Sequence, residues 1–525
     1  PCDASIPPAN GAVGDCTSEL ESGSSCQPTC DAGYAASGPS TCEEGYLRPA
    51  FCTMYPQRAK LTGSYAGKNH YFGRGDMSID GDTIVVGVPY RSSGSASNVG
   101  EAYVYVRDTP GDLASGWTEI QRLLGTGSAN QYFGDRTAVQ GDTIAISQTR
   151  QNAVRVYRRT TPGDLTSTFQ QVVYLQATDS VSGDSFGAGM SISGDTMVVG
   201  AFNHDSVIGS TQQSDSGAAY VFRRDTPGDP TSTWTEVVKL TASDGVASGR
   251  FGKLVSLDGD TVAIAATKDG SGSLAGAVYV FTRNSPGELT SNWTQVAKLT
   301  PIGVDPTVTS WTNNGGFGEH IALDGDTVVV GARYDDDMGS NTGAAYVYVR
   351  ETPGELSSNW RSHQKLTASD ASADNDAMFG SSLAIDGDMI VIGAYQDDTD
   401  KGDSSGSVYM FTLTTPGDPT STWTQHRKLT ASDGATGDNL GYQGLAIDGE
   451  TIVVGAYGVD GIDSGTGAAY VFSSLPSCDA SAPPANGAVG DCTSKLIYGG
   501  SCQPACDAGY APTGPTVCDD GVLTP

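Results

Sequence analysis

Short apolar runs recur along the chain from about residue 57 to residue 473, at intervals of roughly 60 residues. A nearly all-apolar run such as TVVVG at 327–331 predicts a strand that is buried on both faces. A later run such as GAAYVYVR at 343–350 alternates small and aromatic side chains and predicts another strand. Each repeat opens with a Phe-Gly pair or a variant of it: Phe72-Gly73, Phe133-Gly134, Phe186-Gly187, Phe251-Gly252, Phe317-Gly318, Phe379-Gly380 and Gly441-Tyr442.

A tight turn follows each opening pair, as in SIDGDTIVVG at 78–87. Five of the seven turns contain Asp-Gly, the preferred pair for a two-residue hairpin loop, and Gln140-Gly141 and Ser193-Gly194 keep the glycine. A TPG or SPG segment predicts a further turn after the third strand. The fourth strand then begins with an aromatic residue, which is Trp117, Phe169, Trp234, Trp293, Trp360 or Trp423.

The seventh repeat ends at Phe472 and lacks a fourth strand of its own. The missing strand is found at the other end of the repeats, where QRAKLT at 57–62 matches the fourth strand QVAKLT at 295–300. An N-terminal strand that completes the last repeat would close a ring and remove its exposed edges. We therefore expect an all-β chain that forms a seven-bladed β-propeller closed by this strand, and we disfavour an open solenoid.

Cysteines are confined to the two ends of the chain, with six of the eleven in the first 52 residues and the rest after residue 477. The two ends repeat each other, since CDASIPPANGAVGDC at 2–16 returns as CDASAPPANGAVGDC at 478–492. Clustered cysteines in short Gly/Pro-rich segments predict disulfide-rich modules and an oxidising compartment. The expected domains are 1–53 and 476–525 for the modules and 54–475 for the propeller.

The second module has five cysteines where the first has six. When the two modules are aligned, the equivalent of Cys52 would fall just past Pro525. We therefore expect the second module to be cut short before its sixth cysteine. We also expect the parent protein to be a string of module–propeller units.

The repeats resemble the FG-GAP family, which forms the propeller of integrin α-subunits. The matching features are the Phe-Gly pair, the GVP, GAR or GAY segment after the second strand, and the YVY or YVF of the third strand. The resemblance implies a β-propeller at the cell surface or outside the cell. It does not imply one function, because the family includes adhesion receptors, a phospholipase with a separate catalytic domain, and other surface proteins.

The terminal modules resemble sushi (complement-control) domains through the first Cys, PPANG, CDAGY, a GPSTC segment and the last Cys. The tryptophan usual before the last cysteine is absent. The sushi pattern implies Cys2–Cys42 and Cys30–Cys52, and leaves Cys16–Cys26 as an extra bridge. The same pattern implies Cys478–Cys518 and Cys492–Cys502 in the second module.

The chain is acidic, with 60 Asp and Glu residues against 29 Lys and Arg and a formal net charge of −31. This charge repels phosphate backbones and anionic lipids, so we expect no nucleic-acid partner, and no membrane insertion because no apolar segment is long enough. Calcium, basic protein surfaces or simple solubility remain as explanations. Other copies of the chain, other extracellular proteins and glycans are the expected partners.

Aspartates gather in the loops between the second and third strands of the later repeats. The integrin calcium loop, between the first and second strands, is missing because only a tight turn stands there. The acidic loops could instead bind Ca²⁺ or a basic partner, and ordinary solvated loops are the alternative. No cofactor is required. The candidate calcium ligands are Asp335, Asp337, Asp397, Asp398, Asp400 and Asp403.

No catalytic motif is evident, because the five histidines are scattered and no GxSxG, HExxH or phosphate loop occurs. Paired loop carboxylates leave an enzyme open as the least favoured function. Arg74-Gly75-Asp76 spells an adhesion tripeptide, but its place beside the Phe-Gly pair predicts buried structure. Asn292 begins an N-glycosylation sequon in an expected surface turn.

The favoured function is a structural or adhesive subunit of an extracellular assembly, such as a surface filament, a flagellar hair (mastigoneme-like) or a matrix layer. The alternative is a receptor-like module that binds a protein or glycan through the acidic loop face, with or without calcium. We expect the protein not to be an enzyme.

Overall fold

The computed structural model divides the chain into two compact units, Ala59–Phe472 and a second unit of Pro1–Arg58 with Ser473–Pro525. The boundaries lie within a few residues of the predicted 54–475. The structure describes residues 2–5, 11–14, 16–26, 29–30, 34–36, 40–43, 46–48, 52–54, 57–65, 67–93, 96–113, 115–125, 129–268, 276–301, 315–371, 376–415, 417–461, 464–473, 487–488, 490, 501–502, 505–506, 516–519 and 522–524.

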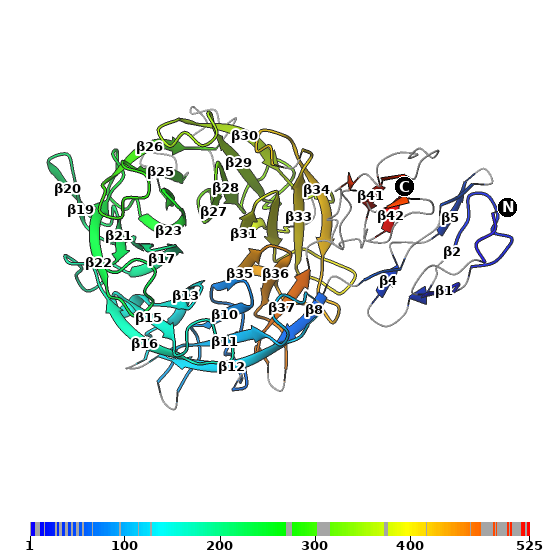
Figure 1. The fold of residues 1–525 in the computed structure, drawn as a ribbon, viewed down its shortest axis with the longest axis horizontal. Coiled ribbons are helices and arrows are strands. Elements are labelled where there is room, and N and C mark those ends of the chain that lie inside the picture. The colour runs from blue at the N-terminus through cyan, green and yellow to red at the C-terminus, as the bar shows by residue number, and fades with distance from the viewer. Residues whose placement is uncertain are drawn as a thin grey trace. The chain divides into compact units, whose positions relative to one another are not determined.

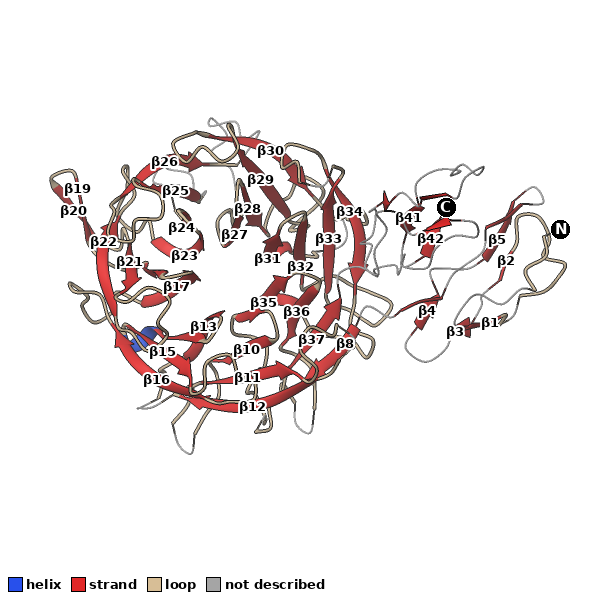
Figure 2. Ribbon diagram, in the orientation of Figure 1, coloured by secondary structure: helices blue, strands red, loops and turns tan. Residues whose placement is uncertain are grey.

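Within these residues the first unit is a ring of seven four-stranded antiparallel sheets, the blades, arranged around a central axis (Figure 1). The first strand of each blade lies nearest the axis and the fourth lies at the rim. Figure 2 shows an almost purely β chain, in which the short 3₁₀ helix η1 (Thr149–Gln151) is the one helical element among the residues drawn. The predicted all-β, seven-bladed fold is confirmed.

The first four blades follow one another in chain order from strand β9 onward. Blade 3 carries an additional hairpin in the loop between its second and third strands. Blade 1 is β9 (Met77–Asp80), β10 (Thr83–Val88), β11 (Glu101–Arg107) and β12 (Trp117–Leu124); blade 2 is β13 (Phe133–Gln140), β14 (Thr143–Gln148), β15 (Ala153–Arg159) and β16 (Phe169–Leu175); blade 3 is β17 (Phe186–Ser193), β18 (Thr196–Ala201), β21 (Ala218–Arg224) and β22 (Trp234–Leu240), with hairpin β19 (Ser206–Ile208) and β20 (Thr211–Gln213); blade 4 is β23 (Phe251–Asp258), β24 (Thr261–Ala266), β25 (Ala277–Arg283) and β26 (Trp293–Leu299).

The last three blades complete the ring, and the final one takes its fourth strand from the beginning of the repeats. Blade 5 is β27 (His320–Asp324), β28 (Thr327–Ala332), β29 (Ala344–Arg350) and β30 (Trp360–Leu366); blade 6 is β31 (Phe379–Asp386), β32 (Met389–Ala394), β33 (Ser407–Leu413) and β34 (Trp423–Leu429); blade 7 is β35 (Leu440–Asp448), β36 (Thr451–Ala456), β37 (Ala468–Ser473) and β8 (Gln57–Leu61).

The ring closes as predicted, because β8 lies beside β37 at the outer edge of blade 7. Leu61 of β8 is 3% exposed and joins the apolar cluster that links blade 7 to blade 1. The Arg58 Nη2 donates to Ser473 Oγ at 3.1 Å, so the strands that lead into and out of the propeller are adjacent.

The Phe-Gly signature is explained by the contact between successive blades. Gly200 is the last but one residue of the second strand of blade 3, and a Cβ built on it would stand 1.9 Å from the carbonyl oxygen of Gly252 in blade 4. The Phe before that glycine is buried, and Phe251 forms a parallel bridge with Gly217 of the preceding blade. The core therefore lies between neighbouring blades, and glycine is required where their backbones touch.

The hairpin turns differ in detail from the Asp-Gly prediction. Asp80 pairs with Thr83, so the two loop residues are Gly81 and Asp82, with glycine in the left-handed region at φ 53°. Asp80 is instead the last strand residue, and its carboxylate accepts the N–H of Gly141 in the next blade at 2.6 Å. The aspartate before the glycine thus connects blades rather than shaping the turn.

A buried arginine at the end of the third strand makes a second connection between blades. In blade 4, Arg283 Nε pairs with Asp260 and its Nη2 donates to Thr196 of blade 3 at 2.8 Å. The guanidinium also lies over the Trp293 ring at 4.7 Å, a cation–π contact. Equivalent contacts are made by Arg107, Arg159, Arg224 and Arg350, whereas blade 6 has Leu413 at this position.

The cysteine-rich unit contains two sets of short strands with matching order. The disulfides Cys2–Cys42 and Cys16–Cys26 are present; the first is a pair that the sushi resemblance implied, and the second is the expected extra bridge. The predicted Cys30–Cys52, Cys478–Cys518 and Cys492–Cys502 bridges involve side chains outside the described residues, and Cys506 is half-buried and unpaired. The first set is β1 (Gly11–Ala12) with β3 (Thr29–Cys30), β2 (Ser25–Cys26) with β5 (Ser40–Glu43) and β6 (Tyr46–Arg48), and β4 (Tyr34–Ala36) with β7 (Cys52–Met54); the second is β38 (Gly487–Ala488) with β40 (Ala505–Cys506), and β39 (Ser501–Cys502) with β41 (Thr516–Asp519) and β42 (Val522–Thr524).

Candidate functional site

The two ends of the propeller have different connections. Because each blade is antiparallel and starts at the axis, the tight turns and the TPG segments share one end, which we call the turn end. The loops between second and third strands and the connections between blades share the other, the loop end. The predicted acidic loops therefore lie on one end of the ring, together with the residues that begin each first strand.

The aspartates of the loop end are largely paired with the protein's own side chains. In blade 4 the connection residue Asp244 accepts the Tyr279 hydroxyl at 2.7 Å and binds Lys298 at 2.7 Å. Partial burial opposes it, but these two contacts hold the pKa of Asp244 below its usual value. Equivalent Asp–Tyr–Lys triads are Asp179–Tyr220–Lys239, Asp370–Tyr409–Lys428 and Asp433–Tyr470–Lys60.

The six predicted calcium ligands belong to two separate loops. Asp335 and Asp337 both contact Lys365, at 2.8 and 2.5 Å, while Asp397 is buried and contacts Lys428 at 2.7 Å. In the described part of the chain, no three His, Cys, Asp or Glu side chains are placed to hold a metal ion. The calcium site stays a prediction, and the six predicted ligands do not come together at one point in the described residues. The remaining contacts are Asp398 with the Ser404 N–H, Asp400 with Lys401, and the Asp403 carbonyl with the Gly437 N–H.

The burial of these carboxylates predicts unequal effects for two equivalent lysines. Replacing Lys365 by methionine should lower the free energy of unfolding by about 1–2 kcal/mol, because it leaves the Asp335 carboxylate, 3% exposed, without its cation. Replacing Lys298 should cost less than about 1 kcal/mol, because Asp244 is 50% exposed and can bind water. Urea unfolding of both variants measures the difference, and equal losses would contradict the role of burial.

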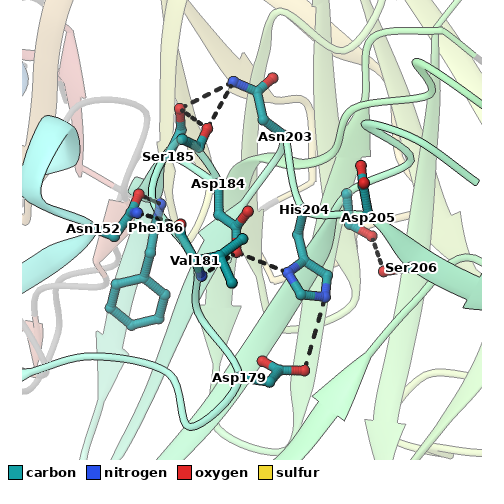
Figure 3. Close-up of polar contacts among 12 residues, drawn as sticks. Asn152, Asp179, Val181, Asp184, Ser185, Phe186, Asn203, His204, Asp205 and Ser206 are labelled. Atoms are coloured by element: carbon teal, nitrogen blue, oxygen red, sulfur yellow. Dashed lines mark hydrogen bonds and ion pairs between the residues drawn. The ribbon is translucent and has the colours of Figure 1, made fainter.

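Blade 3 has a histidine, His204, at the position where blade 5 has Asp335. His204 is 6% exposed, and Figure 3 shows its Nδ1 facing Asp184, at 2.9 Å, and its Nε2 facing Asp179, at 3.8 Å. The Nε2 also lies 2.6 Å from Lys239 Nζ. Asp184 also accepts the N–H of Val181, and Asn152 of blade 2 bonds the Phe186 N–H. These contacts hold the connection between blades 2 and 3 in place. They are structural contacts, since each polar atom named has its partner within the fold.

A cavity of about 90 Å³ lies on the axis and is lined by the first strands of all seven blades. Several lining residues are apolar, such as Met190 and Leu383, but most of the surface that faces the cavity is polar and belongs to residues such as Asp76, Arg136 and His320. Burial, together with Arg136, Arg333 and Lys253, lowers the pKa of His320 well below its usual value, so this histidine is neutral at pH 7.

Burial in the channel raises the pKa of Asp76 to about 6, against the effect of Arg136. A carboxyl group whose pKa is higher in the folded protein than in the unfolded chain binds more protons when the protein is folded. Its contribution to the free energy of unfolding is therefore fully present below about pH 4 and is lost as the pH rises to about 6. Asp76→Asn should therefore raise the free energy of unfolding by about 1–3 kcal/mol at pH 7.5 and leave it unchanged at pH 3.5. Thermal unfolding of the wild type and of Asp76→Asn across this pH range measures the difference. An equal gain in stability at pH 3.5 and pH 7.5 would show that the charge of Asp76 is not its cause.

The axial cavity lies in the central channel of the ring, and we call the loop-end opening of this channel the channel mouth. A continuous series of tyrosines borders one side of the channel mouth. Successive rings lie 4.8 to 6.2 Å apart and meet edge to face, an arrangement that favours aromatic pairs. All are half-buried, and the guanidinium of Arg74 lies among them, 4.3 Å from the Tyr90 ring centre. This tyrosine arc, in spatial order, is Tyr132, Tyr90, Tyr71, Tyr457, Tyr442 and Tyr395.

The other side of the channel mouth is basic. Lys253 Nζ lies 4.4 Å from the Phe202 ring centre, and Arg250 lies 5.9 Å from it. Burial is the main cause that lowers the pKa of Lys253; Arg136 and Arg250 add to it, and the carboxylates of Asp135 and Glu319 oppose it. Arg333 adds to it, although it also pairs with Glu319 at 2.7 Å. We call Arg136, Arg150, Arg250, Lys253 and Arg333 the basic arc.

Several of these residues hold an unfavourable backbone conformation. The residue before the opening Phe has a positive φ in each blade, and at Tyr71, Tyr132 and Arg250 it is a bulky residue at 52–60°. Such residues are uncommon in the left-handed region, where Gly and Asn are preferred. Asn439 and Gly316 occupy the same position in blades 7 and 5. The large side chains at the mouth are thus present at a cost in stability, as is common at binding sites.

Sequence reasoning did not find the channel mouth. Its residues follow the second strand, as in GVPY at 87–90 and GARY at 331–334, or follow the Phe-Gly pair, as in FGRG and FGKL. Those segments were used as fold signatures, and the variable residue beside each was not compared between blades. The tripeptide Arg74-Gly75-Asp76 lies here as the expected buried structure, with Arg74 against tyrosines and Asp76 facing the cavity.

The predicted sequon lies where expected, at the start of the fourth strand of blade 4. Asn292 and Thr294 are exposed, while Trp293 between them is buried. The scattered histidines have separate surroundings. His363 of blade 5 lies 2.8 Å from the Ser421 carbonyl, in the turn before β34 of blade 6, whereas His204 lies by Asp184 and His320 lines the cavity.

Comparison with known proteins is consistent with this architecture. The FG-GAP repeat family matches residues 55–105, 169–222, 234–281, 293–348, 360–411 and 423–472. Among solved structures, virginiamycin B lyase from Staphylococcus aureus aligns over 79% of this chain and 98% of its own (9% identity, TM-score 0.41), and a putative 6-phosphogluconolactonase from Bacteroides fragilis NCTC 9343 over 79% and 94% (10% identity, TM-score 0.43). No curated protein matches the sequence.

The family matches cover six of the seven blades and more than half of the chain, and the described residues contain no helix that meets the length and hydropathy needed to span a membrane. The unmatched repeat is blade 2, which keeps the Phe-Gly pair but has SQTR in place of the usual GAY-type segment. The chain belongs to the FG-GAP repeat family.

Proposed function

We propose that this protein is an adhesive building block of an extracellular assembly, in which each propeller is carried by cysteine-rich modules. The observation that supports this best is the position of the two ends of the propeller. β8 and β37 are neighbours, and Arg58 donates to Ser473 at 3.1 Å, so the chain enters and leaves at one blade. A propeller that is connected through one blade could be repeated along a chain of modules without opening its ring.

The modules are the second support for this proposal. We propose that they are sushi-like and that the bridges Cys30–Cys52, Cys478–Cys518 and Cys492–Cys502 add to the two disulfides already described. Disulfides persist in oxidising surroundings, and FG-GAP repeats are typical of surface proteins, so the proposed location is outside the cell. Repetition of one module sequence on both sides of the propeller suits a filament, a flagellar hair or a matrix layer.

We further propose that the protein has no catalytic role and requires no cofactor. A receptor-like use of the acidic loops is less well supported, because Asp244, Asp335 and Asp397 are bound by lysines of the same chain. The channel mouth has free aromatic and basic groups, so it is the better candidate for contact with other copies, extracellular proteins or glycans.

Electron microscopy of the native extracellular material tests this proposal. Polymers or layers with a repeat of one module–propeller unit are expected, with propellers at the side of a thinner thread, and mild reduction of the disulfides should shorten or disperse them. Isolated single particles in native material, unchanged by reduction, would reject the role in an assembly.

A further inference from the structure

Positive charge exceeds negative charge at the channel mouth, although the chain as a whole carries −31: the five cations of the basic arc stand against the nearby carboxylates of Asp76, Asp135 and Glu319. Within the described ranges, Arg136, Arg150, Arg250 and Lys253 have no carboxylate at ion-pair distance, whereas lysines elsewhere on the loop end are paired. Arg136 instead donates to the Ala188 carbonyl at 2.9 Å, and Lys253 and Arg250 lie beside Phe202. An acidic protein that keeps unpaired cations together at one opening has a local attraction for anions.

The tyrosine arc adds a second kind of recognition to the same opening. Its six rings come from blades 2, 1, 7 and 6, and the residues of the basic arc come from blades 2, 4 and 5, so the two arcs lie on different sides of one axis. The rings are half-buried and carry hydroxyl groups that can donate or accept hydrogen bonds. Aromatic rings with a polar edge suit a ligand that has both C–H faces and hydroxyl groups.

We propose that the channel mouth binds an acidic saccharide, a sugar chain that bears carboxylate or sulfate groups. The C–H faces of the sugar rings would pack on the tyrosine arc, and the anionic groups would bind the guanidinium and ammonium groups of the basic arc, as Arg binds carboxylates and oxyanions in two-point contacts. This inference rests on the proposed function, in which the loop end faces extracellular material. The proposed ligand class is what the channel mouth would bind in that assembly.

Carboxylate and sulfate groups share this chemistry, so the structure does not separate uronate from sulfated sugars. An acidic peptide is less well matched, because a peptide presents few apolar C–H faces flat enough for six neighbouring tyrosines. Nucleic acids are disfavoured by the charge of −31, which repels a long phosphate backbone beyond the mouth.

The conformation of Arg250 makes a sharp test possible. Its φ of 60° is strained for arginine, and asparagine adopts this region more easily. Arg250→Asn should therefore raise the melting temperature while it removes one cation from the basic arc. A loss of binding in this variant cannot come from unfolding. If the arginine were present for structure alone, the same substitution would change stability without changing binding.

Isothermal titration calorimetry of the full chain with three matched probes tests the proposal: tri-galacturonate, a sulfated galactotriose and neutral galactotriose. We expect at least one anionic probe to bind at least tenfold more tightly than the neutral one. Arg250→Asn and Lys253→Gln should each weaken that binding by about tenfold, the loss typical of one charged hydrogen bond. Arg223→Gln, which removes a cation near Asp225 at the turn end, is the matched control and should not change it.

The outcomes separate the two proposals. Preference for tri-galacturonate or for the sulfated sugar supports the inference and identifies the source of the anion. No binding of either anionic probe, equal binding of the neutral sugar, or binding unaffected by Lys253→Gln would overturn it. If electron microscopy shows regular polymers but no saccharide binds, the saccharide proposal is overturned and the assembly proposal stands. If a saccharide binds but the native protein is found only as isolated particles, the assembly proposal is overturned and the saccharide proposal stands.

Discussion

Leu61→Asp should open the propeller ring and lower the free energy of unfolding by about 3–5 kcal/mol. Leu61 is 3% exposed and packs in a cluster with Phe72 and Tyr103, so a carboxylate there loses the apolar contact and has no cation to bind. β8 would then detach from β37 and leave an unpaired strand edge. Urea unfolding measures the loss of stability, and limited proteolysis near residues 57–62 reports the detached strand.

Lys60→Gln is the matched control in the same strand. Its Nζ binds Asp433 at 2.6 Å, but the two side chains are 32% and 49% exposed, so the pair contributes at most about 1 kcal/mol. This variant should keep protease resistance and nearly all of the stability. If Leu61→Asp were as stable as Lys60→Gln, the N-terminal strand would not be what holds the ring closed.

The closure of the ring could be predicted because it depends on local patterns that repeat. Each strand is a short run with its own turn chemistry, and QRAKL at 57–61 repeats the fourth strand of other blades. Repetition made the missing strand of the last repeat visible. In the structure Leu61 and the opening Phe residues are buried.

The contacts between blades could not be derived in the same way. Asp80 was assigned to its own turn because Asp-Gly is a common hairpin pair, yet its carboxylate bonds Gly141 of the next blade. Likewise the acidic loops were considered as metal sites because the lysines that bind them, such as Lys365, lie on a strand about 30 residues away. Partners that are distant in sequence and fixed only by the ring are not visible in a local pattern.

The channel mouth was missed for a related reason. Tyr90, Tyr395 and Tyr457 follow the second strands of three different blades, so they become neighbours only when the ring brings seven strand ends together. The residues also vary from blade to blade, whereas the surrounding positions repeat. Comparing the variable residue next to each repeated motif would have found this group of side chains without the structure.

The two ends of the ring therefore use polar groups differently. At the turn end, Arg350 is 2% exposed and bonds Asp326 of its own blade and Thr261 of the blade before it. At the loop-end mouth, Arg250 and Lys253 of the basic arc lie next to the Phe202 ring, and no described carboxylate lies at ion-pair distance from them. The first arrangement suits a rigid ring, and the second leaves groups that can still bind a ligand.

Arg350→Leu should lower the free energy of unfolding by about 2–4 kcal/mol. The substitution leaves Asp326 without the guanidinium at 2.6 Å and Thr261 without its donor at 2.9 Å, and it removes the contact with the Trp360 ring. Breaking one side of a buried ion pair costs more than the pair itself contributes, because the remaining charge stays desolvated. Asp326 is 21% exposed, which places the expected loss below that of a fully buried carboxylate.

Blade 6 provides the matched comparison, because Leu413 stands where blades 1 to 5 have arginine. Asp388 there already accepts the Gly417 N–H at 2.9 Å, and Thr327 of blade 5 and Trp423 are buried nearby in the positions equivalent to Thr261 and Trp360. Leu413→Arg should therefore change stability by less than about 1 kcal/mol, since a complete buried pair roughly balances its own desolvation. Urea unfolding of both variants in parallel measures the two changes in the free energy of unfolding. Equal losses of stability from Arg350→Leu and Leu413→Arg would show that the side-chain volume at this position matters and that the arginine–threonine hydrogen bond between blades does not.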